Sequence, residues 1–202
     1  MPSTKRDAIC DAALSLFAQQ GIDGTATREI TERAGTAEGT LYRHFEGKQA
    51  LAEYLFERGA QQFHDHLRRS IGEETAPRDV LAALVRGIFS FGQAQPDAFR
   101  YLLSMHHTGI LKDRDGTLPP PMHPFIETLE RGMETGAFRT LPPALATGWI
   151  IAMAQRAIVF LGSDVIDDSP ETVVEHTVRA ALRIVDARCT LHASPDPPLS
   201  NA

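Results

Sequence analysis

The sequence predicts an all-α protein in which a short amino-terminal helix-turn-helix unit precedes a longer helical unit. Three observations predict this fold class. Apolar residues recur at intervals of three and four along most of the chain, which is typical of amphipathic helices. Proline and capping residues stand where these segments begin. No segment shows the strict apolar–polar alternation that indicates a half-buried strand.

The first expected helix covers residues 4–20. Thr4 and Asp7 have the spacing of a capping box, in which each residue bonds the backbone of the other. Gly21 suits the conformation that ends a helix. The expected buried face consists of Ile9, Ala13, Leu16 and Phe17.

Two short helices are expected between residues 27 and 45, joined by a tight turn at Gly35. Their apolar residues are spaced by four positions, so each helix has one buried stripe. The expected buried residues are Ile30 and Ala34 in the first helix, and Leu41 and Phe45 in the second. Such a pair of helices is how a chain builds a helix-turn-helix that docks on DNA.

The outer face of the second short helix carries residues suited to DNA. Arg43 could make the bidentate contact to guanine that is the commonest specific base contact, and Gly39 removes bulk where a backbone must approach the groove. Tyr42, His44 and Lys48 carry donors for phosphate oxygens. Any short amphipathic helix pair could share this spacing, so a purely structural role is the alternative. The expected DNA-binding residues are Thr27, Arg28, Gly39, Thr40, Tyr42, Arg43, His44 and Lys48.

The charge balance of the chain does not by itself favour nucleic acid, because the net charge is −6. Residues 1–50 hold six Lys/Arg against seven Asp/Glu, a net charge of −1. The distribution of charge matters more than its sum. We therefore expect DNA binding through few phosphate contacts per subunit, from basic residues gathered on one surface.

Residues 6–51, RDAICDAALSLFAQQGIDGTATREITERAGTAEGTLYRHFEGKQAL, resemble the amino-terminal DNA-binding domain of TetR-family transcriptional regulators. The most specific part is GTLYRHF followed three residues later by Lys48. The resemblance covers about a quarter of the chain. It implies a homodimer with an all-helical carboxy-terminal ligand and dimer domain, usually a repressor released by its ligand. The matching positions are Ile9, Ala13, Phe17, Gly21, Thr27, Ile30, Ala34, Gly35, Gly39, Thr40, Leu41, Tyr42, His44, Phe45, Lys48 and Leu51.

The chain departs from this family pattern at Ala26, where many relatives have Thr, at Thr31, where Ala is usual, and at residues 36–37, where Thr-Ala replaces Val-Ser. Losing Ser at position 37 removes the usual N-cap of the second short helix, at a cost of about 1 kcal/mol. We expect Thr36, or Glu38 near the positive end of the helix, to compensate.

The remaining helices are expected in order along the chain. A long helix from Lys48 to about Ile71 continues directly from the amino-terminal unit without a flexible linker. Proline begins the next two helices, at Pro77 and Pro96, since it is pre-set for the first helical turn. A proline-containing loop over 108–124, helices over 125–136, 142–161 and 169–187, and a disordered tail over 188–202 complete the chain.

The last two helices are more apolar than a lone monomer requires. One face of each must cover the core, and the other requires a partner. Pairing with a second copy would give a four-helix, twofold dimer interface; the alternative is that both are central core helices. The expected interface residues are Ile151, Ile158, Val174, Val178, Ala181 and Val185.

No catalytic motif or metal-ligand pattern stands out, so we expect neither an enzyme nor a cofactor. His64 and His66 are two positions apart and do not face each other on a helix. A mostly apolar small-molecule pocket among the carboxy-terminal helices is the better candidate site, although ordinary core explains most of its residues equally well. The expected ligand-binding residues are Phe63, Phe91, Met105, His106, Phe125, Trp149, Met153 and Arg156, with Gln155 as a further polar group.

These features predict a dimeric DNA-binding regulator that reads a palindromic double-stranded operator and is released by a small, largely apolar effector. The alternatives are a constitutive or architectural DNA-binding protein, or a small-molecule-binding protein whose amino-terminal helices are only structural. The expected domains are 1–47 for DNA binding and 48–187 for effector binding and dimerisation. With no signal peptide, no stretch of roughly 20 apolar residues and two distant cysteines, a cytoplasmic protein with free thiols and no membrane span is expected.

Overall fold

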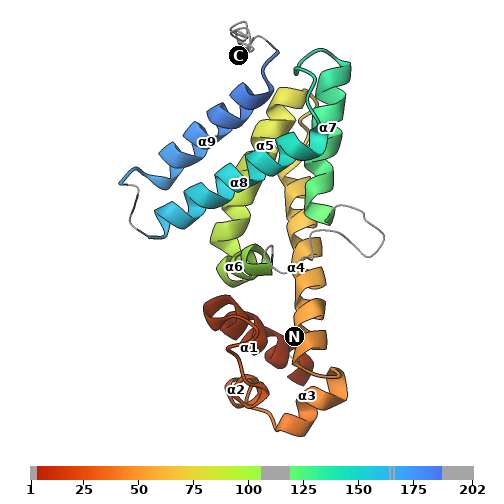
Figure 1. The fold of residues 1–202 in the computed structure, drawn as a ribbon, viewed down its shortest axis with the longest axis vertical. Coiled ribbons are helices and arrows are strands. Elements are labelled where there is room, and N and C mark those ends of the chain that lie inside the picture. Colours follow the sequence, from red (N-terminus) through yellow and green to blue (C-terminus); the bar gives the residue numbers. More distant parts are fainter. Residues whose placement is uncertain (1–3, 106–118, 164, 166, 188–202) are drawn as a thin grey trace, which may run out of the picture.

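The structure is a computed structural model that describes residues 4–105, 119–163, 165 and 167–187 (Figure 1). The described residues are helical apart from their connections and one isolated bridge between Phe138 and Asp186, which confirms the all-α fold. The helices are α1 (Lys5–Gln20), α2 (Thr27–Arg33), α3 (Glu38–His44), α4 (Lys48–Ile71), α5 (Pro77–Ala94), α6 (Pro96–Met105), the short 3-10 turn η2 (Pro120–Met122), α7 (His123–Glu134), α8 (Pro143–Leu161) and α9 (Pro170–Val185). The expected tail and most of the expected 108–124 loop lie outside the described residues.

The expected start and stop signals lie at the helix ends. Thr4 Oγ1 accepts a hydrogen bond from the Asp7 backbone N–H at 3.1 Å, and Asp7 Oδ2 accepts one from the Thr4 N–H at 3.1 Å. Gly35 ends the turn after α2 with φ of 63°, a conformation that side chains other than glycine rarely adopt. Some boundaries differ by two residues: α7 begins at His123, before the expected start, because Pro124 fits the first helical turn, and α7 and α9 end earlier than expected, at Glu134 and Val185.

Two apolar cores are joined by α4. The first core lies within the amino-terminal helices α1–α3 and the first half of α4, where Leu51 and Leu55 are buried. The second core lies among α4–α9 and takes Ala60, Phe63 and Leu67 from the same helix. We call the first part, residues 4–55, the head and the rest the body. Because α4 runs continuously through both cores, the head is attached to the body by a rigid helix.

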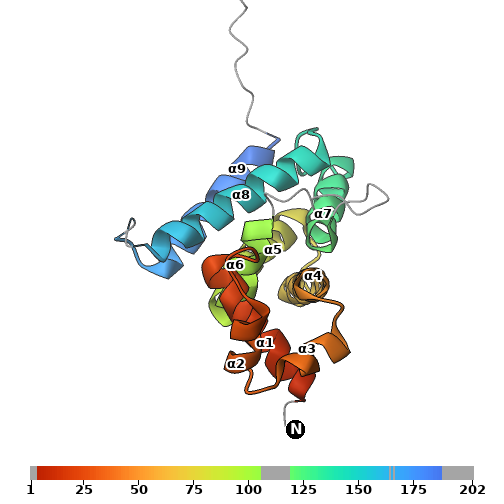
Figure 2. The same cartoon turned by 60° about the horizontal axis from the view of Figure 1, so that its bottom comes forward.

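Helix α6 belongs to the body by sequence but also packs into the head (Figures 1 and 2). Its Tyr101 is 1% exposed and lies within the core of the head. The Tyr101 hydroxyl donates to the Ala52 carbonyl oxygen on α4 at 2.8 Å, and its ring centroid lies 5.8 Å from that of Phe17 on α1. Burial raises the pKa of the Tyr101 hydroxyl. Phe99 and Leu102, from other positions of α6, are buried in the body.

Helices α8 and α9 lie side by side at the edge of the body (Figure 1). The face of α9 that was expected to meet a partner is covered within the single chain: Val178, Ala181 and Val185 are buried. These residues pack in the core of the body because α9 turns its apolar stripe toward α5 and α8. Large apolar side chains are instead exposed on α8, namely Leu145, Trp149, Val159 and Phe160, at 36–47%.

Helix α8 is also unusual in composition. Within the described residues it is the one helix that is long and apolar enough to cross a membrane, with a mean hydropathy of 1.6 over an 18-residue window. This differs from the expectation that no segment approaches a membrane span. Core helices of globular proteins can meet the same two criteria, but only 22% of this window is buried inside the protein. The exposed side of α8 is therefore an apolar surface that a single chain leaves uncovered.

Candidate DNA-binding surface and ligand pocket

The head presents α3 as its outermost helix, at the end opposite to α5, α8 and α9 (Figure 1). Ile30 on α2 and Leu41 on α3 are fully buried and Phe45 is 8% exposed, so these three residues hold the two short helices against α1 and α4. This burial agrees with the expected inward positions. Tyr42 is 54% exposed, and Arg43 and His44 are also exposed, so α3 offers a polar outer face.

Gly39 lies on the same exposed part of α3. A Cβ atom built at this position would meet nothing within 4 Å, and its φ is not in the left-handed region. The fold of the free protein therefore does not require glycine at position 39. The space that glycine leaves on this face is the property for which the sequence placed Gly39 among the expected DNA-binding residues.

The amino-terminal end of α3 lacks a side-chain cap, as expected from Ala37. Thr36 does not replace the missing cap: its buried Oγ1 has no hydrogen-bond partner in the part of the chain that the structure describes. Glu38 is the acidic residue in the first turn, where a negative charge is favourable. Of the two expected compensations, the geometry therefore provides Glu38 only.

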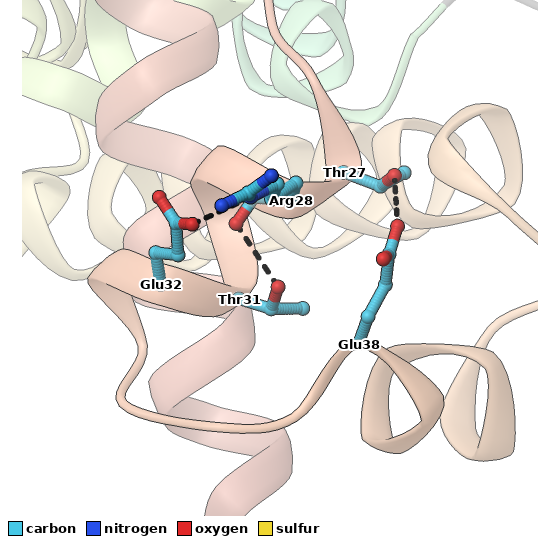
Figure 3. Close-up of polar contacts among 5 residues, drawn as sticks. All are labelled: Thr27, Arg28, Thr31, Glu32 and Glu38. Atoms are coloured by element: carbon cyan, nitrogen blue, oxygen red, sulfur yellow. Dashed lines mark hydrogen bonds and ion pairs between the residues drawn. The ribbon is translucent and has the colours of Figure 1, made fainter.

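The carboxylates of Glu32 and Glu38 accept hydrogen bonds from side chains at the start of α2 (Figure 3). The Thr27 hydroxyl donates to Glu38 Oε1 at 3.0 Å, which connects the first residues of α2 and α3. Arg28 Nε donates to Glu32 Oε1 at 2.7 Å, and this hydrogen bond raises the pKa of the Arg28 guanidinium. Two of the expected DNA contacts are thus engaged within the protein.

Lys48 and Arg6 also have partners inside the head. Lys48 Nζ donates to the Thr25 carbonyl oxygen at 2.8 Å, and this contact fastens the start of α4 to the loop between α1 and α2. The Arg6 guanidinium lies over the ring of Tyr54, 4.3 Å from its centroid. Arg43, by contrast, makes no hydrogen bond or ion pair with any residue among those the structure describes. It is therefore free to contact a ligand on the outer face of α3.

An apolar pocket of about 270 Å³ lies in the body, just below the ~300 Å³ lower end typical of small-molecule sites. Its walls come from α4, α6, α8 and the segment around η2. Gln155 is the one polar side chain among its described lining residues. Those residues are Phe56, Ala60, Phe63, Phe99, Leu102, Leu103, Pro119, Pro121, Met122, Gly148, Ile151, Ala152 and Gln155.

The wall formed by residues 119–122 is held by a histidine on α4. His64 Nδ1 lies 2.7 Å from the Pro120 carbonyl oxygen and donates to it in the tautomer that carries a proton on this nitrogen. The other nearby histidines do not form a metal site: no group of three or more His, Cys, Asp or Glu side chains within the described residues could hold a metal ion. His64 therefore has a structural contact beside the pocket.

The expected ligand-binding residues differ in how they lie relative to the pocket. Phe63 lines the pocket, together with Gln155. Phe91 lies behind Phe63, at 4.7 Å between ring centroids, and Phe125 is fully buried in the core. Trp149 is 44% exposed and does not line the pocket.

Of the four other expected positions, two do not line the pocket and two lie outside the described residues. Met153 packs against the core without lining the pocket, and the exposed Arg156 guanidinium lies 5.7 Å from the ring centroid of Phe160. The Met105 side chain and His106 lie outside the described residues. Ile151, expected at the dimer interface, lines the pocket.

Two lining residues that were not expected at the site have a signal in the sequence. Gly148 and Ala152 are small residues four positions apart on an apolar helix, so they share a face and leave space beside it. The prolines at 119 and 121 have no comparable signal, because a pocket wall made from an irregular segment follows no periodicity.

An exposed helix-turn-helix joined by a long helix to a helical body with an apolar pocket defines a class of helical regulators that bind DNA. Residues 9–55 match the family described as bacterial regulatory proteins, tetR family. This amino-terminal part of the chain is therefore of the TetR family of transcriptional regulators.

Three similar proteins illustrate the range of the match. The HTH-type transcriptional repressor KstR2 of Rhodococcus jostii (strain RHA1) is 27% identical over 143 residues, covering 68% of this chain and 70% of that protein. The tetracycline repressor protein class D of Escherichia coli is 36% identical over 73 residues, covering 36% of this chain and 34% of that protein. The crystal structure of the transcriptional regulator FadR from Bacillus subtilis in complex with stearoyl-CoA has a TM-score of 0.68 at 19% identity, covering 87% of this chain and 96% of that one.

The chain spans 34–43% of the length of four of the curated relatives it matches, including a KstR2 of Mycolicibacterium smegmatis. The likeness to FadR extends over nearly the whole of that structure and shows that the two proteins share a fold.

Proposed function

We propose that this protein is a dimeric, sequence-specific DNA-binding repressor that leaves its operator when a small, largely apolar ligand enters the pocket of the body. The observation that carries the proposal is that the exposed α3 face and the apolar pocket are joined by the same two elements, α4 and α6. In this proposal residues 1–47 bind DNA, residues 48–187 bind the effector and the second subunit, and the protein works in the cytoplasm without catalytic activity.

The DNA contacts are proposed to come from the outer face of α3. Arg43 and Thr40 would face base edges, and the Tyr42 and His44 side chains would face phosphates. The exposure of Tyr42, Arg43 and His44 supports this assignment. The test is selection of bound duplexes from a random DNA pool, which should yield a palindrome with half-sites roughly 34–36 Å apart or a multiple of this. Recovery of no preferred sequence would refute the assignment.

The effector is proposed to be an apolar chain, such as an acyl group. The nearly uniform apolar lining supports this class, and so does the likeness in fold to the FadR of Bacillus subtilis, which was crystallised in complex with stearoyl-CoA. A series of fatty acids and acyl-CoA thioesters of increasing length should include members that raise the melting temperature and weaken operator binding together. Since the pocket is small, we expect the response to peak at one chain length rather than to increase without limit.

Coupling between the two sites is proposed to pass through α6. Phe99, Leu102 and Leu103 line the pocket, whereas Tyr101 on the same helix lies in the core of the head. A ligand that displaces α6 therefore also displaces a residue held between α1 and α4. Release requires the ligand to bind the arrangement that cannot bind DNA more tightly than the one that can. A difference of about 1.4 kcal/mol shifts this equilibrium tenfold.

The second subunit is proposed to cover the exposed face of α8, with α9 beside it. The partner is a second copy because DNA recognition by a helix-turn-helix of this size uses two half-sites, and because α8 leaves large apolar side chains uncovered in the single chain. The contacting residues would then be Leu145, Trp149, Val159 and Phe160. Ile158 and Val174, which the sequence also placed at the interface, are partly buried on the same two helices.

A further inference from the structure

Glu38 occupies an unusual place for an acidic residue. It is the first residue of α3, and the first residues of a recognition helix are those that contact base edges in a helix-turn-helix complex. Its carboxylate is exposed and accepts the hydrogen bond from Thr27 on α2 at 3.0 Å (Figure 3). The first helix of the motif crosses the DNA backbone, so Thr27 is placed for a phosphate. In the free protein Glu38 therefore occupies a donor that DNA would otherwise use.

A carboxylate at this position restricts which DNA the head can accept. An ionised carboxylate is a hydrogen-bond acceptor only, and phosphate oxygens are also acceptors. Glu38 therefore forms no hydrogen bond with the DNA backbone and is repelled by its charge. In the major groove it is also repelled by guanine O6 and N7 and by thymine O4, which are acceptors. The amino group of cytosine is the donor with which acidic side chains commonly pair.

The structure points to a role that follows from this chemistry. We propose that Glu38 is a specificity-determining residue: it holds Thr27 away from phosphates on unselected DNA, and on the operator it accepts a hydrogen bond from cytosine N4. This inference rests on the proposed DNA-binding function. The Arg28–Glu32 pair has the same character, since a carboxylate again engages a donor at the start of α2. Both pairs would further lower the affinity for unselected DNA of a head whose residues 1–50 already carry a net charge of −1.

The alternative is that Glu38 only stabilises the uncapped start of α3. The two roles differ in their readout. Loss of a purely helix-stabilising charge lowers the melting temperature and weakens binding to all sequences alike. Loss of a specificity-determining carboxylate changes the preferred base at one position of each half-site and raises the affinity for unselected DNA relative to the operator.

The test compares Glu38→Gln with wild type by selection from a random pool and by titration of operator and unselected duplex. The wild type should select cytosine at one position, and Glu38→Gln should lose that preference in favour of adenine, which Gln pairs with through N6 and N7. The discrimination lost should be roughly 5- to 150-fold, as expected for one base contact. The matched control is Glu46→Gln, which makes the same charge change at an exposed head residue with no bond to any described side chain. It should alter affinity for all sequences equally.

Several outcomes would overturn the inference. An unchanged base preference in Glu38→Gln, or an equal change in Glu46→Gln, would leave Glu38 with a stabilising role only. If Glu38→Gln does not fold, Thr27→Val provides a second measurement: it releases Glu38 from its partner, so the cytosine preference should persist, and its loss would contradict the assignment. If the wild type selects no DNA, the proposed function itself fails; if it selects an operator whose affinity does not depend on cytosine at any position, only the role of Glu38 fails.

Discussion

Replacing Tyr101 with Phe tests the connection between the pocket and the head by removing a single hydroxyl group. The hydroxyl donates to the Ala52 carbonyl at 2.8 Å in a buried site, whereas the ring, 5.8 Å from Phe17, remains. A hydrogen bond of this kind contributes about 0.5–1.5 kcal/mol. The Ala52 oxygen lies inside α4 and can still accept the helix's own hydrogen bond, so no acceptor is left unpaired. We expect Tyr101→Phe to lower the free energy of unfolding by about 1 kcal/mol.

Urea denaturation measures this change directly, and a chain of this size should lose about 2–4 °C of melting temperature per kcal/mol. The matched control is Ser104→Ala at an exposed position of the same helix, whose hydroxyl donates to the Tyr101 carbonyl oxygen at 2.8 Å and which is not part of the core of the head. It should cost less, since surface changes usually stay within about 0.5 kcal/mol. Equal stability of Tyr101→Phe and wild type would show that the hydroxyl contributes nothing to the junction.

The same variant separates ligand binding from DNA release. Tyr101 does not line the pocket, so Tyr101→Phe should bind the acyl probes as the wild type does. The ligand should, however, weaken operator binding less than in the wild type, because α6 is held less firmly to α4. Operator titrations with and without ligand give the coupling as a ratio of affinities. A ratio unchanged in Tyr101→Phe and reduced in Ser104→Ala would refute transmission through this contact.

Three further predictions concern the head, the α8 surface and the half-buried His66 of α4. Arg43→Ala should lose about 1–3 kcal/mol of discrimination at one base position, measured by competition between single-base operator variants, and an unchanged preference would show that the assigned face of α3 is wrong. The double change Trp149→Glu and Phe160→Glu should give monomers with weak operator binding in sedimentation experiments, whereas the control Val165→Glu, at a 63% exposed loop residue, should leave the dimer intact. Burial lowers the pKa of His66, so below about pH 6.5 the unfolded chain takes up a proton that the folded protein resists, and the free energy of unfolding falls as the pH decreases. The urea midpoint of His66→Gln should therefore depend less on pH between 7 and 5 than that of wild type. An equal pH dependence in the two proteins would exclude His66 as the cause.

Helix boundaries could be predicted from sequence because their signals are local. The Thr4–Asp7 capping box and the prolines at 77 and 170 act within one turn of the residues they affect, and the structure has helices beginning at these points. The head could be predicted for a related reason: Ile30, Leu41 and Phe45 recur at helical spacing, and a motif this short leaves few other ways to bury them.

The partners of the apolar faces could not be predicted in the same way. Periodicity identifies an apolar stripe but not the surface that covers it. Val178 and Val185 have the pattern of an interface and are covered by their own chain, whereas Trp149, expected in a pocket, is exposed. The hydrogen bond from Lys48 to the Thr25 carbonyl could not be predicted from the sequence either, because it joins residues 23 positions apart and depends on the conformation of a loop.

The position of Tyr101 has a consequence for recombination between regulators. A head cut out at residue 47 and joined to a foreign body would lack Leu51, Leu55 and the tyrosine ring that complete its core. Helix α6 would have to be transplanted with it, or the new body would have to present an aromatic residue at the same place. Hybrids that combine the operator of one regulator with the effector of another are therefore constrained by Tyr101, which lines neither site. A domain exchange that preserves the packing of α1 against α6 should yield a working hybrid.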